Sequence, residues 1–109
     1  MSKSVTSPVK KWPGKVILAD PITFPQLYAF EDSVDQIQNN REISRDRADG
    51  IWIPGILACA EKWDLENFPK EPTVENFPAS PRIASSKLIA WLVAEITKIY
   101  QEAEELPNA

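Results

Sequence analysis

An apolar stripe with helical spacing near the end of the chain restricts the fold most strongly. The apolar positions recur every three or four residues: Leu88, Trp91, Leu92, Ile96 and Ile99. This spacing predicts one face of a long helix. Ser80 and Pro81 precede the stripe, a serine cap followed by a proline in the first turn. We therefore expect a helix from Ser80 to about Glu105, and its apolar face is wider than one packed neighbour would cover.

Two further helices are expected earlier in the chain. Thr23 can cap a helix over residues 24–39. Its apolar positions again keep helical spacing: Leu27, Phe30, Val34 and Ile37. A second helix is expected from Ile53 or Pro54 to about Asp64, and its apolar residues on several sides predict burial between neighbours. The charged segment 41–50 between these two helices is expected to be a loop.

The N-terminal region predicts one short strand over residues 15–20, stopped by Pro21. A lone strand leaves its backbone groups unpaired, so it must pair with another strand or another chain. Residues 1–11 are polar and basic, and we expect a flexible arm there. Residues 12–106 are expected to form a single helical domain. The predicted fold class is mainly α, with about three helices, a short N-terminal β-strand or hairpin and a Pro-rich crossover.

The Pro-rich crossover lies between Leu65 and Pro81 and contains a near-repeat. The sequence Glu-Asn-Phe-Pro occurs at residues 66–69 and again at residues 75–78. Because a residue before proline favours extended backbone, Phe68 and Phe77 should both lie on extended segments. Either these rings pin the crossover to the core, or they are exposed anchors for a partner. Of the four tryptophans, Trp12 is the one we expect a partner to reach.

Composition argues against catalysis and against nucleic acid as a partner. The 109 residues contain no histidine and have a net charge of −4, whereas phosphate binding needs concentrated Lys and Arg. Cys59 is the single cysteine, so it has no disulfide partner and no histidine to activate it. Glu61 and Asp64 could share a helix face and hold a cation, but a solvated pair is the expected reading. We expect no catalytic residue, no metal and no cofactor.

No stretch reaches the roughly 20 apolar residues of a membrane span. The N-terminus lacks the apolar core of a signal peptide. These features predict a soluble protein of the cytoplasm that does not bind membranes.

The order of these segments resembles a tail assembly chaperone of long-tailed bacteriophages or prophages. The likeness lies in three segments: Trp12–Phe30, Ile53–Trp63 and Phe77–Ala103. The resemblance implies a small helical, non-enzymatic protein in the bacterial host cytoplasm. It would coat the tape measure protein during tail construction, and its copies could self-associate.

The alternative readings are a structural tail-completion or connector protein, and a small acidic inhibitor of a host protein. The candidate partner-binding residues are the expected exposed aromatic residues and two positions of the last helix: Trp12, Phe68, Phe77, Leu92 and Ile96. On this hypothesis, Leu92→Glu should abolish partner binding. Leu92 could instead belong to the core, so a loss of binding with the fold retained is the informative outcome.

Overall fold

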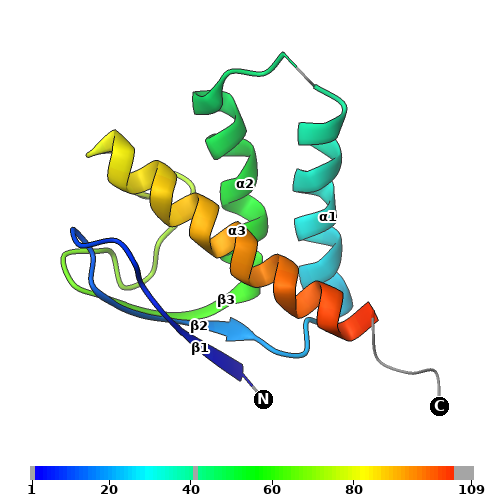
Figure 1. Cartoon of the computed structure of the whole chain (residues 1–109), viewed down its shortest axis with the longest axis horizontal. Helices are drawn as coiled ribbons and strands as arrows, with labels where there is room; N and C mark the ends of the chain where they lie inside the picture. The colour runs from blue at the N-terminus through cyan, green and yellow to red at the C-terminus, as the bar shows by residue number, and fades with distance from the viewer. Residues whose placement is uncertain (1, 41, 105–109) are drawn as a thin grey trace.

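The computed structural model of the chain describes residues 2–40 and 42–104. Within this part, three strands form one antiparallel sheet in the order β1-β2-β3: β1 (Ser2–Thr6), β2 (Gly14–Ala19) and β3 (Ala60–Leu65). Three helices complete it: α1 (Phe24–Gln38), α2 (Arg45–Cys59) and α3 (Arg82–Glu104). In Figure 1, α1 and α2 stand side by side, α3 crosses in front of their lower parts, and the sheet lies below α3.

The prediction of a mainly α fold is wrong. The described residues form a small compact α/β domain with three helices and a three-stranded antiparallel sheet. The sequence predicted one strand, and the structure places a partner on each side of it. Ser2–Thr6, expected within a flexible arm over 1–11, forms β1. Ala60–Leu65, expected to be mostly the end of a helix, forms β3.

The register of the sheet explains how β2 satisfies its backbone. Val16 lies opposite Val5 on β1 and Trp63 on β3, and all three side chains are buried on the inner face. Ile17 lies opposite Ser4 and Lys62 on the outer, more polar face. The sheet therefore has one face in the core and one in solvent, as antiparallel sheets commonly do.

Helix α2 begins earlier and ends earlier than predicted. Ser44 caps it, because the Ser44 hydroxyl accepts a hydrogen bond from the Arg47 backbone N–H. The prediction placed the start of this helix at Ile53 or Pro54, whereas Pro54 lies inside the helix. The segment expected as a charged loop thus supplies the first turns of α2. After Cys59 the chain passes directly into β3.

The prediction of α1 is confirmed, since the helix spans Phe24–Gln38 with Thr23 as its N-cap. It packs against α2 at a close contact around Gly55. A Cβ at that glycine would lie 2.9 Å from the Ser33 hydroxyl oxygen and 3.1 Å from the Phe30 Cα. The Ser33 hydroxyl donates a hydrogen bond of 2.8 Å to the Ile51 carbonyl, which further joins the two helices.

The Pro-rich crossover is held by an aromatic cluster beside β3. Phe68 stacks on Trp63 with ring centroids 5.3 Å apart, and Trp12 meets Phe68 edge-on at 5.4 Å. Phe77 completes the cluster, 5.6 Å from Phe68 and 6.0 Å from Trp63. The near-repeat in the sequence is therefore two anchor points of one connection.

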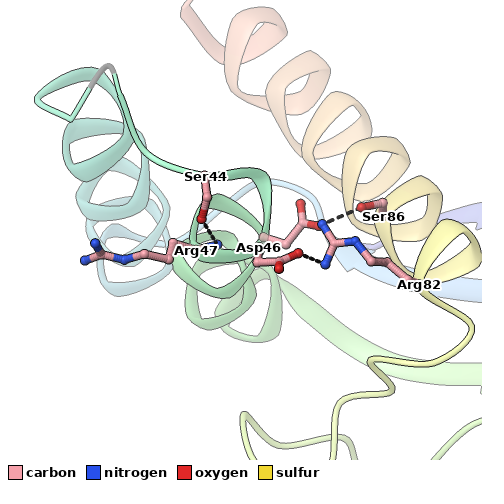
Figure 2. A network of polar contacts seen from close by, with 6 residues as sticks. Ser44, Asp46, Arg47, Arg82 and Ser86 are labelled. Carbon is pink, nitrogen blue, oxygen red and sulfur yellow. Dashed lines mark hydrogen bonds and ion pairs between the residues drawn. The ribbon is translucent and has the colours of Figure 1, made fainter.

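Helix α3 begins at Arg82, and its predicted end near Glu105 lies outside the described residues, as does the end of the predicted domain at residue 106. The first turns of α2 and α3 are joined by polar contacts, which Figure 2 shows. Arg82 forms an ion pair with Asp46, and the Ser86 hydroxyl donates a hydrogen bond of 2.7 Å to Asp49. These contacts hold the N-terminal ends of the two helices together.

Candidate protein-binding surface

The five residues that the sequence singled out for partner binding all lie in the core. Their exposed fractions are 3% for Trp12, 7% for Phe68, 7% for Phe77, 0% for Leu92 and 0% for Ile96. The first three belong to one aromatic cluster, and the last two lie on the buried stripe of α3. None of these side chains offers a surface to a partner in this structure.

Cys59 is buried, and burial raises the pKa of its thiol to about 11. The thiol donates a weak hydrogen bond to the Gln26 carbonyl, 3.6 Å away. A protonated thiol is a poor nucleophile, so this position suits packing. Glu61 and Asp64 are exposed residues of β3, and Glu61 lies where the register with β2 shifts, so the two do not share a helix face as predicted. In the part of the chain that the structure describes, no group of acidic or cysteine side chains could hold a metal ion.

Two exposed aromatic side chains stand out on the first turns of α1. Phe24 is 72% exposed and Tyr28 is 65% exposed. Their rings stack on one another with centroids 6.1 Å apart and an interplanar angle of 19°. Large aromatic side chains in solvent are uncommon on a small domain, and neighbouring pairs of them mark interaction sites.

Helical geometry places two acidic residues in line with this aromatic pair. Glu31 and Asp35 follow Phe24 by seven and eleven positions, so at 3.6 residues per turn the four side chains form one stripe along α1. We call this the α1 stripe: Phe24, Tyr28, Glu31 and Asp35. Its aromatic half lies at the start of the helix and its acidic half lies nearer the end.

The acidic half of the α1 stripe borders a groove between α1 and α3. The groove encloses about 410 Å³. Its walls combine apolar and polar side chains from three helices: Phe30, Val34, Trp52, Thr97, Tyr100 and Gln101. Trp52 of α2 is half-buried and packs on Phe30 with ring centroids 5.7 Å apart. A hollow with aromatic walls and an acidic border suits an apolar side chain flanked by positive charge.

Sequence reasoning missed this surface although its signal was present. Phe24 and Tyr28 are four residues apart and lie off the apolar face that includes Phe30 and Val34. Two aromatic residues on the polar side of an amphipathic helix were the available sign. The groove itself depends on where α3 crosses α1, and that crossing cannot be read from either helix alone.

Comparison with protein-family models, with curated proteins and with solved structures finds no match to this chain. Among the described helices, none is both long enough and apolar enough to cross a membrane.

Proposed function

We propose that this chain is a non-enzymatic, protein-binding chaperone of phage tail assembly that binds an amphipathic helix of the tape measure protein. The observation that most supports binding is the alignment of Phe24 and Tyr28 with the acidic border of the α1–α3 groove. An amphipathic helix laid along α1 could bury apolar side chains against the rings and in the groove. Basic residues beside them would face Glu31 and Asp35.

The choice of the tape measure protein as partner comes from the resemblance to tail assembly chaperones. Such a partner is long, helical and apolar in places, and a cover on its apolar faces keeps it from aggregating. The proposal places the encounter in the bacterial host cytoplasm, where tails are built. Self-association of the chain, which the resemblance also implies, stays a prediction.

The test is co-expression of the chain with the tape measure protein of the same phage. We expect the tape measure protein to remain soluble with the chain and to aggregate without it. The double variant Phe24→Ser and Tyr28→Ser should lose most of this effect. Each buried aromatic anchor contributes about 2 kcal/mol to binding, so its removal weakens binding about 30-fold. Both side chains are mostly exposed, so the variant should keep its fold.

The matched control is Val74→Ser, because Val74 is 52% exposed on the crossover and lies outside the α1–α3 groove. This variant should behave as the wild type. If the tape measure protein is equally soluble with and without the chain, the chaperone proposal fails. Recovery of the chain from purified mature tails would then favour a structural tail protein, and capture of a host enzyme would favour an inhibitor.

A further inference from the structure

A second surface, on a different part of the molecule, collects lysines around an exposed isoleucine. The β1–β2 connection and the first turns of α3 enclose an open hollow of about 460 Å³. Lys10 and Lys11 border it from the connection, and Ile83 and Lys87 border it from α3. We call this the lysine hollow. Figure 1 shows the β1–β2 connection and the start of α3 at the same end of the molecule.

Within the residues that the structure describes, no ion pair neutralises the positive charges of the lysine hollow. In residues 2–40 and 42–104, the lysine ion pairs are Lys70 with Asp64 and Lys98 with Glu95, and neither belongs to the hollow. The neighbouring Arg82 differs, because it pairs with Asp46 of α2 (Figure 2). The hollow thus has three exposed, unpaired cations in a chain whose net charge is −4.

The helix adds to this field and the isoleucine adds an apolar contact. The N-terminal end of a helix carries partial positive charge, and α3 has no acidic residue of its own in its first turn. The carboxylates that contact this end come from α2, where Asp46 pairs with Arg82 and Asp49 accepts a hydrogen bond from Ser86. Ile83 is 73% exposed at this end, the highest value among the large apolar side chains of the described residues. Anionic groups would be attracted here, and an apolar side chain would find a contact between them.

From this charge complementarity we propose that the lysine hollow docks an acidic peptide segment that presents an apolar side chain to Ile83. Its carboxylates pair with Lys10, Lys11 and Lys87. A nucleic acid fits less well, because three lysines on a negatively charged protein give a weak field for a polyanion. The lysine hollow shares no residue with the α1–α3 groove. On α3, Lys87 and Thr97 are ten positions apart, roughly 15 Å, so this proposal stands independently of the proposed function.

The experiment measures binding of short synthetic peptides to the full chain by fluorescence anisotropy. The probes are a peptide that alternates Glu with Leu, a second that alternates Glu with Ser, and a third that alternates Lys with Leu. We expect the Glu/Leu peptide to bind most tightly and to weaken as NaCl is raised to about 0.5 M. The triple variant Lys10→Glu, Lys11→Glu and Lys87→Glu should bind it about tenfold more weakly or worse.

Two further variants separate the apolar contact from the charges of the lysine hollow and control for the loss of a lysine elsewhere. Ile83→Ser should reduce binding of the Glu/Leu peptide about tenfold, since it removes the apolar contact and leaves the charges. Lys62→Glu changes one exposed lysine on the outer face of the sheet and should leave binding unchanged. Circular dichroism should show the wild-type fold for each variant, because the altered side chains are exposed.

The proposal is overturned if the triple variant binds the Glu/Leu peptide as the wild type does. It is also overturned if the Lys/Leu peptide binds at the hollow, or if a single-stranded oligonucleotide or anionic vesicles bind there more tightly than the Glu/Leu peptide. Loss of tape measure solubilisation in the Phe24 and Tyr28 variant bears on the proposed function and leaves this test unaffected.

Discussion

Replacing each of the three glycines by alanine should have three different effects on stability, and Gly14 should be the most sensitive. Gly14 opens β2 with φ of +133°, a backbone conformation that side chains rarely adopt. A Cβ there would lie 2.1 Å from the carbonyl oxygen of Asp64 and 3.1 Å from the Cα of Leu65. Both are backbone atoms of β3, so no side chain can rotate to make room.

The cost of Gly14→Ala has two parts. The strained backbone costs about 1–3 kcal/mol, and forcing β3 away from β2 costs about 1–3 kcal/mol, as overpacking does. The sum of about 2–6 kcal/mol is a large fraction of the stability of a small domain. At about 4–8 °C per kcal/mol, the melting temperature should fall by at least roughly 8 °C.

The same substitution at the other glycines supplies the controls. A Cβ at Gly50 of α2 meets nothing within 4 Å, so Gly50→Ala should stabilise by up to about 1 kcal/mol through helix propensity. Gly55→Ala has the same gain in helix propensity, but its Cβ would press on Ser33 and Phe30 of α1. Its stability should therefore lie between those of Gly14→Ala and Gly50→Ala.

Urea unfolding monitored by tryptophan fluorescence measures the free energy of unfolding of the wild type and the three variants. The signal comes from Trp12 and Trp63, which are buried and change environment on unfolding. Wild-type stability in Gly14→Ala, or a greater loss in Gly50→Ala than in Gly14→Ala, would refute the packing of β2 against β3 described above.

Three further predictions concern the core, the thiol and the surface. Leu92→Glu should abolish cooperative unfolding rather than only partner binding, because Leu92 is 0% exposed and a buried carboxylate has no partner there; a folded variant in circular dichroism would contradict this. Burial raises the pKa of Cys59 from 9.0 to about 11. Between these pH values the folded state keeps a proton that the unfolded chain releases. The free energy of unfolding should therefore fall as pH rises through this range, by up to about 1.4 kcal/mol per pH unit. Subtracting the pH profile of Cys59→Ala isolates this contribution, and identical slopes in the two proteins would argue against it. Arg82→Met should cost less than about 1 kcal/mol in thermal unfolding, because its ion pair with Asp46 is exposed to solvent; a larger loss would mean that the contact between α2 and α3 is a major source of stability.

Local signals were sufficient for α1 and for most of α3. Each has apolar residues at helical spacing, and α1 has Thr23 as its cap. Such patterns act within one element, so they survive whatever packs against them. The same holds for the need of β2 to find a partner, since a strand cannot satisfy its own backbone.

Other features had local signals that were read for the wrong element. Ser44, with Asp46 in the following turn, is the signal for the N-terminus of α2. The prediction placed that N-terminus at Ile53 or Pro54 instead. Residues 60–65 alternate near their end, with Trp63 and Leu65 buried on either side of exposed Asp64. A short run of this kind fits both the strand and the helix pattern. Residues 60–65 form a strand because β2 offers a backbone edge with which they can pair.

The sequence by itself determined the helical faces, the scarcity of catalytic side chains and the overall negative charge. The tertiary structure alone decided which aromatic residues are buried. Trp12 precedes β2 and packs on Phe68 of the crossover, and Phe68 and Phe77 both pack on Trp63 of β3. Their burial therefore depends on contacts that no local pattern records. The exposed Phe24 and Ile83 are left outside for the same reason: burial is a property of the assembled surface, and it is set by which faces find a neighbour.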